Sequence, residues 1–238
     1  MNLIILQPED FVSPDEAELS GRRFEHIRNI LKADTGKICR VGMLGGQLGE
    51  GRVIAVKQDS LRLNVTLNQN PPSAVPLTLI FALPRPKTLK KVLHAALSMG
   101  VKKIFIIEAW KVDKSYWTTP LLTESGLMEQ IIPALEQARD TLLPDIQIRR
   151  RFKPFAEDEL RGIIGDSLAL AAHPGSTKIC PAQLQTSVTL CIGPEGGFTD
   201  YEIDLLVANG CQSVNIGSRI LRTEVAVPAL IGRLFANV

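Results

Sequence analysis

The sequence lacks the patterns typical of membrane, secreted or metal-binding proteins. None of its apolar stretches reaches the roughly 18 residues that a transmembrane helix needs, although hydrophobic residues make up 45% of its 238 residues. The first ten residues have no basic segment before their short apolar stretch and turn acidic at Glu9, unlike a secretory signal. We therefore expect a cytoplasmic globular protein, for which 22% charged residues is an ordinary share.

Cysteine is scarce, and its four occurrences are scattered at Cys39, Cys180, Cys191 and Cys211. The sequence has no C-x-x-C pair and no histidine at ligand spacing, so we expect neither a zinc site nor a disulfide framework. Cys39, Cys180 and Cys191 lie in apolar runs, which favours buried thiols. No bound metal is expected.

The chain also lacks a strong net charge, because its formal charge is +2 and its pI about 8.4. These values do not by themselves predict a nucleic-acid partner. The basic residues are nevertheless clustered: residues 22–40 hold six against two acidic ones, and residues 85–114 hold eight against two. A third cluster is Arg149-Arg150-Arg151 with Lys153. Basic runs on helices are commonly solvated faces, so these clusters only support an RNA-binding hypothesis.

Short β-prone runs dominate the first seventy residues. Residues 37–43 and 51–56 are two such runs, and residues 60–67 alternate apolar and polar side chains, as a half-buried strand does. Residues 22–31 have the apolar periodicity of a helix. Several short strands at close spacing predict a small barrel, and the proline-bearing residues 68–76 predict a linker.

After residue 76 the pattern alternates between β and α. Residues 77–83 form a continuous apolar run, typical of a strand buried on both faces, residues 87–99 have helical periodicity, and residues 103–108 are again apolar and β-branched. Together they predict a βαβ unit, in which a crossover helix joins parallel strands. Further strands are predicted at 167–172, 188–192 and 213–216, and further helices at 127–140, 199–209 and 224–235. This alternation predicts an α/β sheet covered on both faces.

Three of the predicted strands lead into unusual loops, at residues 173–175, 193–198 and 217–224. Open α/β sheets bind ligands beyond the carboxyl ends of their strands. The middle loop has three glycines in five residues, which let a ligand approach the backbone or permit positive φ angles. Taken alone, this pattern fits a glycine-rich turn without a ligand equally well. Thr199 and Glu202 predict a capping box that starts the next helix.

No dinucleotide or triphosphate fingerprint accompanies the middle loop. The sequence has no G-x-G-x-x-G opening a helix after a strand and no G-x-x-x-x-G-K-[ST]. Glu195 in this loop would repel a triphosphate, so a neutral or cationic ligand is favoured. S-adenosylmethionine, which carries a sulfonium, is such a ligand.

Several sequence motifs resemble one family. GPEGGFTDYE (193–202) and NIGSRILRTEVA (215–226) look like the paired C-terminal motifs of the bacterial 16S rRNA uridine N3-methyltransferases of the SPOUT superfamily. RRFEHIRNILKADTGKICRVG (22–42) is similar to the N-terminal RNA-binding segment of that family. LHAALSMGVKKI (93–104) resembles its first helix-to-strand crossing, and ALEQARDTLLP (134–144) its E-Q-containing helix. The resemblance therefore extends along most of the chain.

The resemblance implies a PUA-like, RNA-binding β-barrel over residues 1–72 and a SPOUT α/β methyltransferase domain with a trefoil knot over residues 73–238. Nothing in the periodicity shows a knot, and true knots are otherwise nearly absent from proteins. The resemblance also implies a homodimer that binds S-adenosylmethionine in the knot and acts on 16S rRNA within the small ribosomal subunit. Val225 departs from the family, whose members commonly have threonine there. The change leaves the protein class the same but replaces the threonine hydroxyl, and any hydrogen bond it would make, by a methyl group.

The implied reaction places demands on particular side chains. Uracil N3 must lose a proton, and the negative charge then spreads onto the flanking carbonyl oxygens. Arg222 is predicted to stabilise this charge, because a guanidinium fork can bond a planar oxygen edge. Glu224 or Glu195 is predicted to accept a proton or to hold cationic groups of the cofactor, although Glu224 could instead simply favour a helix N-terminus. His173 precedes a proline and is better interpreted as shaping a turn than as a base.

The expected cofactor-binding residues, which act largely through their main chain, are Leu170, Ala171, His173, Ile192, Gly193, Glu195, Gly196, Ile216, Gly217, Ile220, Leu221, Arg222, Thr223 and Ala226. The expected RNA-binding residues are Arg22, Arg23, His26, Arg28, Lys32, Arg85 and Lys87. Because N3 lies on the Watson–Crick edge, the target uridine must be unpaired or splayed out. Two alternatives stay open: a non-catalytic rRNA-binding assembly factor, and a methyltransferase acting on another RNA position or a 2′-hydroxyl.

Overall fold

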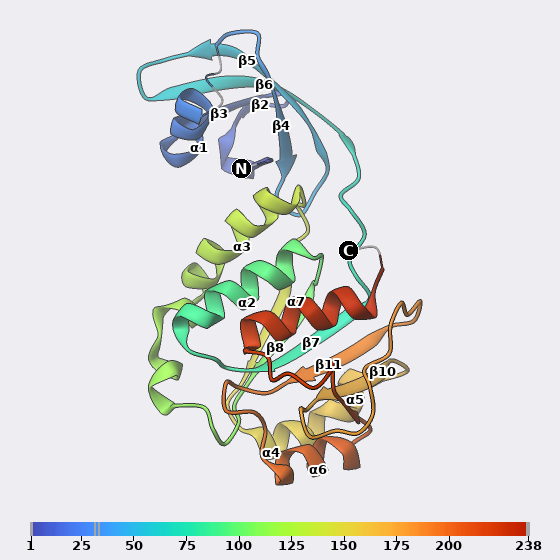
Figure 1. Cartoon of the computed structure of the whole chain (residues 1–238). Coiled ribbons are helices and arrows are strands. Elements are labelled where there is room, and N and C mark those ends of the chain that lie inside the picture. Colours follow the sequence, from blue (N-terminus) through green and yellow to red (C-terminus); the bar gives the residue numbers. More distant parts are fainter. Residues whose placement is uncertain (1, 31, 33, 237–238) are drawn as a thin grey trace. The chain divides into compact units, whose positions relative to one another are not determined.

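The computed structural model describes residues 2–30, 32 and 34–236 (Figure 1). Its contacts divide the chain into two compact units. Unit 1 comprises Met1–Ser73 and Ile132–Leu143, and unit 2 comprises Ala74–Ile131 and Pro144–Val238. The segment Ile132–Leu143, which we expected within the second domain, therefore belongs to unit 1.

Unit 1 is built on a six-stranded mixed sheet. In the order in which they pair, its strands are β1 (Ile4–Leu6), β4 (Ile38–Met43), β5 (Leu48–Val56), β6 (Ser60–Gln69), β3 (Glu16–Ser20) and β2 (Phe11–Ser13). β1 and β4 are parallel and the other pairs antiparallel. The sequence predicted β4, β5 and β6. It missed the first three strands: β1 and β2 have only three residues each, too few to establish a period of two, and β3 alternates over five residues but includes two glutamates, which are uncommon in strands.

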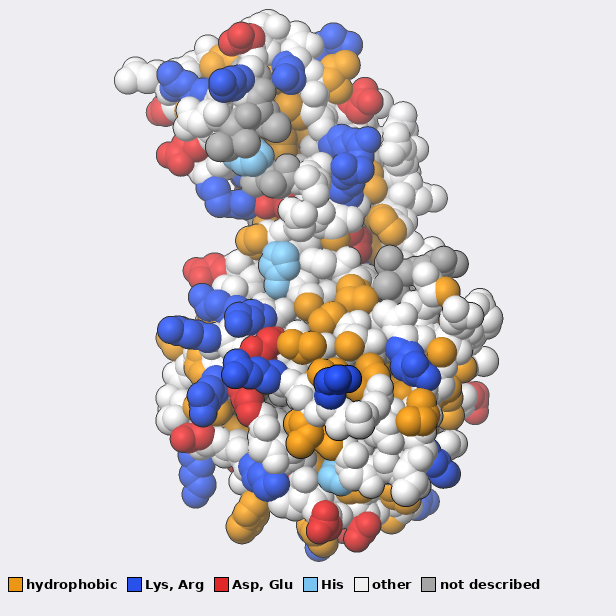
Figure 2. All heavy atoms as spheres, viewed as in Figure 1, with side chains coloured by type: hydrophobic (Ala, Val, Ile, Leu, Met, Phe, Trp, Pro, Cys, Tyr) orange, Lys and Arg blue, Asp and Glu red, His pale blue; other side chains and the backbone are white. Residues whose placement is uncertain are grey.

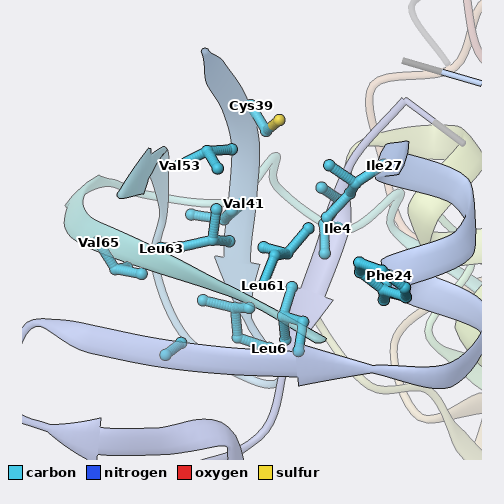
Figure 3. Packing of buried hydrophobic residues seen from close by; sticks show 12 residues of the cluster. Ile4, Leu6, Phe24, Ile27, Cys39, Val41, Val53, Leu61, Leu63 and Val65 are labelled. Atoms are coloured by element: carbon cyan, nitrogen blue, oxygen red, sulfur yellow. The ribbon is translucent and has the colours of Figure 1, made fainter. Parts of the chain in front are cut away.

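The predicted helix at residues 22–31 is present in a divided form. It begins as α1 (Gly21–Glu25) and continues as a π-helical turn, η2 (His26–Ile30); Leu31 lies outside the described residues. Phe24 and Ile27, three residues apart, point into the apolar core of the sheet and are 5% and 0% exposed (Figure 3). Their burial fixes this helix to the barrel.

Unit 2 contains a six-stranded sheet in which every pair is parallel. In spatial order its strands are β12 (Gln212–Val214), β10 (Leu168–Ala172), β11 (Val188–Ile192), β7 (Leu77–Ala82), β8 (Lys103–Ile107) and β9 (Asp145–Arg149). The sequence predicted all of these strands except β9. In that edge strand Asp145, Gln147 and Arg149 alternate with Ile146 and Ile148, so it lacks the unbroken apolar run of a central strand.

Helices cover both faces of this sheet, which confirms the predicted α/β class. α2 (Pro86–Ser98) and α7 (Thr223–Leu234) lie side by side on one face, and α4 (Phe152–Pro154), α5 (Leu160–Ile164) and α6 (Asp200–Ala208) lie toward the other (Figure 1). A π-helical turn, η5 (Phe155–Glu159), joins α4 to α5. α3 (Glu124–Ala138) contributes residues to both units, and short 3₁₀ turns span Pro8–Asp10, Lys114–Thr118 and Pro120–Leu122. No helix within residues 2–30, 32 and 34–236 is long and apolar enough to cross a membrane.

The C-terminal part of the chain returns across the sheet. β11 lies between β10 and β7, and β12 lies beyond β10, after which α7 comes back to pack on α2. The loop between β10 and β11 is tied to the end of α7: Gln183 and Leu184 donate backbone bonds to Arg233 and Leu234, and Arg233 Nε donates to Cys180 O at 2.6 Å. Because β10, β11 and β12 are parallel, the loops that follow them meet at one edge of the sheet. All four cysteines are buried free thiols, including the three predicted to be buried.

Candidate cofactor pocket

A pocket of about 460 Å³ lies at the carboxyl edge of the sheet in unit 2. The three loops predicted to surround a ligand form most of its wall, with one lysine added from the loop after β8. Of the expected cofactor-binding residues, those that line the pocket are His173, Ile192, Gly193, Glu195, Gly196, Ile216, Gly217, Ile220, Leu221, Thr223 and Ala226.

The glycine loop after β11 is compact for a steric reason. Gly197 N donates to Pro194 O at 2.8 Å, and Gly197 adopts a φ of +70°, which favours glycine. A Cβ on Gly193 would lie 2.7 Å from the backbone nitrogen of Phe198. Because that obstacle is main chain rather than a flexible side chain, the loop needs glycine at 193 to close.

A buried carboxylate fixes the end of this loop. Glu202 is 3% exposed, and its Oε2 accepts hydrogen bonds from Thr199 N and Thr199 Oγ1. Thr199 Oγ1 in turn accepts from Glu202 N, which confirms the predicted capping box. The sequence did not reveal that Glu202 Oε1 also accepts from Trp110 N at 2.7 Å. The carboxylate thereby links the loop after β8 to the start of α6.

Charged groups along the pocket edge are held by local partners. Lys111 Nζ donates to Gly196 O at 2.8 Å, and Glu195 Oε1 accepts from Arg85 N at 3.0 Å. Arg85 Nε lies 3.2 Å from Tyr116 Oη, and the pKa of Arg85 is raised, first by this hydrogen bond to Tyr116 and also by the charge of Glu195. The Glu195 carboxylate is thus engaged with main chain, which weakens its expected role as a proton acceptor.

The part of the pocket wall that β10 contributes begins at Ala172, two residues further along the sequence than expected. Leu170 and Ala171 do not line the pocket; they are 1% and 0% exposed and lie within the strand, paired with β11 and β12. Ala172 and His173 form the wall instead. His173 Nδ1 is buried and has no hydrogen-bond partner among the described residues, so a polar atom at the wall is left for a ligand.

The two residues expected to be catalytic do not line the pocket. Arg222 is the exposed N-cap residue of α7, and its carbonyl accepts from Val225 N and Ala226 N. Glu224 Oε1 lies 3.7 Å from Lys91 Nζ on α2, with its side chain 17% exposed. The first turn of a helix directs neighbouring side chains to different faces, so Glu224 is oriented toward α2 although Thr223 lines the pocket.

The expected RNA-binding residues of unit 1 fall into two groups. Arg23 forms a fork with Asp10 at 2.5 and 2.6 Å and also donates to Ile5 O, and Arg22 donates to Glu136 at 2.9 Å. Arg23 is therefore a structural residue and not a free phosphate ligand, which corrects our expectation. The others are half-buried or exposed: His26 is half-buried, Arg28 stacks over Phe24 and donates to Gln58 O, and Lys32 is exposed. In unit 2, Arg85 and Lys87 are exposed.

The pocket wall also holds residues of the predicted loops and motifs that were not named individually, namely Ala172, Pro174, Pro194, Gly197, Phe198, Asp200, Asn215 and Arg219, and three residues outside them that the sequence reasoning missed, namely Lys111, Val214 and Leu230. Most adjoin residues that were predicted. Lys111 differs because it comes from the loop after β8, far away in the sequence. The rule that ligands bind at the carboxyl ends of strands applies equally to β8 and would have indicated this loop.

Comparisons with known proteins agree with this geometry. A family model described as an RNA methyltransferase domain matches residues 71–234. The chain is 31% identical to ribosomal RNA small subunit methyltransferase E of Treponema pallidum, with 100% of this chain and 91% of the relative covered. It is 23% identical to the protein of the same name from Synechocystis, with 98% and 77% covered.

Two solved structures share the fold. One is a methyltransferase from Legionella pneumophila in complex with its cofactor S-adenosylmethionine, with 23% identity, a TM-score of 0.76, and 97% of this chain and 95% of the other covered. The other is ribosomal RNA small subunit methyltransferase E of Neisseria gonorrhoeae bound to S-adenosylmethionine, with 20% identity, a TM-score of 0.72, and 98% and 95% covered. The fold is that of a SPOUT-type α/β methyltransferase with an N-terminal β-barrel. Within this class, the chain belongs to the ribosomal RNA small subunit methyltransferase E family.

Proposed function

We propose that this protein transfers a methyl group from S-adenosylmethionine to N3 of a uridine in 16S rRNA, acting in the cytoplasm as a homodimer on the small ribosomal subunit. The observation that carries the proposal is the pocket enclosed by residues 193–197 and 215–223. These are the segments whose sequences resemble the family's paired motifs, and they come together although they are separated along the chain.

The pocket residues fit this cofactor in size and charge. A volume of about 460 Å³ lies within the range of roughly 300–1,000 Å³ that small-molecule sites occupy. The wall carries the carboxylates of Glu195 and Asp200 as well as the ammonium of Lys111, which suits a ligand bearing both positive and negative groups. The buried Nδ1 of His173 offers one more polar contact. When bound, S-adenosylmethionine supplies an electrophilic methyl group on its sulfonium.

Arg222 is suited to the base rather than to the cofactor. It is exposed, follows directly after pocket residue Leu221, and forms no ion pair with any described residue. Its guanidinium is therefore available to stabilise negative charge on the uracil oxygens as the N3 proton leaves. For Glu224 we propose a positioning role, because its ion pair with Lys91 and its place in the first turn of α7 hold that helix beside the pocket.

Methylation assays on 16S rRNA with mass mapping of the product test the reaction and its target position. Calorimetric titration with S-adenosylmethionine tests the cofactor, and absence of binding heat would favour an assembly factor without chemistry. Substitution Arg222→Ala should lower turnover by at least tenfold, with Arg222→Lys retaining more activity than the alanine variant. Turnover within about threefold of wild type, below about 1 kcal/mol in the barrier, would remove Arg222 from the mechanism.

Exposed apolar side chains beside the pocket support the proposed dimer. Ile220 is 82% exposed and Val225 is 47% exposed, and hydrophobic side chains gather over α7 (Figure 2). Such a patch beside a binding site is typical of a protein interface. Sedimentation velocity should report a dimer, and Val225→Asp should shift it toward the monomer while weakening cofactor binding.

A further inference from the structure

Trp110 has an unusually exposed side chain. It is 84% exposed, more than any other residue among the large exposed hydrophobics of the described chain. An indole buries about 150–250 Å² when it packs in a core or an interface, so an indole left in water is a candidate contact for a partner. Trp110 follows the carboxyl end of β8, the same edge of the sheet at which the pocket lies.

The backbone around Trp110 is firmly held. Trp110 N donates to the buried carboxylate of Glu202 at 2.7 Å, and Val112 N donates to Ala109 O at 3.0 Å. Ala109 and Val112 are 3% and 8% exposed and anchor both sides of the loop. The indole therefore projects from a fixed platform, and little conformational entropy is lost when something binds to it.

The surroundings of Trp110 favour an anionic partner. Three neighbouring parallel strands, β7, β8 and β9, each deliver a cation just beyond their carboxyl ends: Arg85, Lys111 and Arg150. Their side chains donate hydrogen bonds to neutral oxygens: Lys111 to Gly196 O, Arg150 to Trp117 O and Arg85 to Tyr116 Oη. A flat aromatic face among cations matches single-stranded nucleic acid, whose bases stack and whose phosphates carry charge.

We propose that Trp110 stacks on an unpaired base of the RNA substrate next to the methylated nucleotide. Lys111 lines the cofactor pocket and adjoins Trp110 in the chain, so a base on the indole would lie at the rim of the site. A neighbouring nucleotide held there keeps the target uridine splayed toward the pocket. The inference rests on the proposed RNA substrate and adds the residue that positions it.

Substitution Trp110→Ala in the full chain tests the stacking. Base–aromatic stacking is worth about 1–3 kcal/mol per base, so Kd for a labelled single-stranded RNA of mixed sequence should rise roughly 5- to 150-fold. Trp110→Phe keeps an aromatic face and should remain within a few-fold of wild type. KM for 16S rRNA should rise with Kd, and calorimetric affinity for S-adenosylmethionine should not change. Tyr201→Ala, which removes a 59%-exposed ring on α6, is the matched control and should bind RNA normally.

Two results would overturn the proposal. One is RNA affinity within twofold of wild type for Trp110→Ala. The other is equal loss of affinity in Trp110→Ala and Trp110→Phe. A shift to smaller particles in sedimentation, with RNA affinity retained, would assign Trp110 to contact with a second copy of the chain. Failure of the proposed reaction would be seen separately, as absent methylation by the wild-type protein.

Discussion

The two units of this protein use their basic side chains differently. In unit 1, Arg23 is bound by both oxygens of Asp10, and Arg22 is bound by Glu136. At the carboxyl edge of unit 2, Lys111 and Arg150 donate to backbone carbonyls. A carboxylate partner cancels the charge that it holds, whereas a carbonyl partner orients the cation and leaves its charge in place.

This difference shows how a cluster of basic residues in a sequence should be interpreted. The cluster at residues 22–40 was a plausible phosphate-binding segment, yet its most buried arginine, Arg23, stabilises the barrel from within. Unit 2 also has arginine–carboxylate pairs, such as Arg149 with Glu159 at the end of β9, so two consecutive arginines, Arg149 and Arg150, have partners of different types. Charge density in a sequence is therefore a weaker guide to an RNA surface than the type of partner each cation has.

The largest effect we expect follows from Gly193→Ala in the pocket of unit 2. A Cβ there would lie 2.7 Å from Phe198 N, so the loop must open and cofactor affinity should fall about 100-fold or more, roughly 3 kcal/mol. Gly162→Ala in α5 is the control, because its Cβ would have nothing within 4 Å. This control should bind the cofactor normally and gain about 0.5–1 kcal/mol of stability. Calorimetry that shows Gly193→Ala binding within threefold of wild type would contradict this account of the loop.

The next effect concerns the structural arginine of unit 1. Arg23→Ala leaves the Asp10 carboxylate, which is 7% exposed, without its main partner. Breaking a buried pair costs about 3–5 kcal/mol, and the partial exposure of Arg23 reduces the expected loss of unfolding free energy to about 2 kcal/mol. Arg28→Ala removes an exposed cation and should cost well under 1 kcal/mol. Urea denaturation of the two variants would show equal losses if Arg23 were merely a surface residue.

The salt dependence of RNA affinity tests the same difference between the basic residues of the two units, with a smaller expected effect. Arg150→Ala should lower the slope of log K against log salt by about 0.7, the value for one phosphate contact on a single strand. Arg23→Lys keeps the internal charge pair and should leave the slope unchanged. Filter binding at several salt concentrations measures both slopes. A smaller slope in the Arg23 variant than in the Arg150 variant would reverse our assignment.

Much of this architecture could be predicted because local patterns and packing agree. The apolar runs of β7, β8 and β11 and the periodicity of α2 mark buried elements directly, and Thr199 with Glu202 marks the start of α6. The ligand edge followed from the rule on strand ends. The barrel and the methyl-donor chemistry depended on the family resemblance as well as on pattern.

The side-chain contacts of the charged residues could not be predicted, because they involve partners that are distant in the sequence. Nothing local to Arg23 indicates that Asp10 holds it, and nothing local to Glu224 indicates Lys91, more than a hundred residues earlier. The second hydrogen bond of Glu202, to Trp110 N, is of the same kind. These contacts decide which charged residues remain free for a ligand, so site residues are harder to predict than the fold.

The smallest effect we expect is on the pH dependence of stability, to which one carboxylate of unit 1 contributes. Hydrogen bonds from Lys57, Arg62 and Ser60 lower the pKa of Glu18 from 4.5 to about 2. Since the folded pKa lies below the unfolded one, this group adds stability that is fully present above pH 4.5 and is lost as the pH falls toward 2. Glu18→Gln should therefore flatten the pH dependence of the urea midpoint between these limits. The difference should shrink in 1 M salt, because exposed ion pairs are screened. Equal acid sensitivity of wild type and variant would show that these cations do not stabilise the barrel through Glu18, and the comparison between the units would then depend on Arg22 and Arg23 alone.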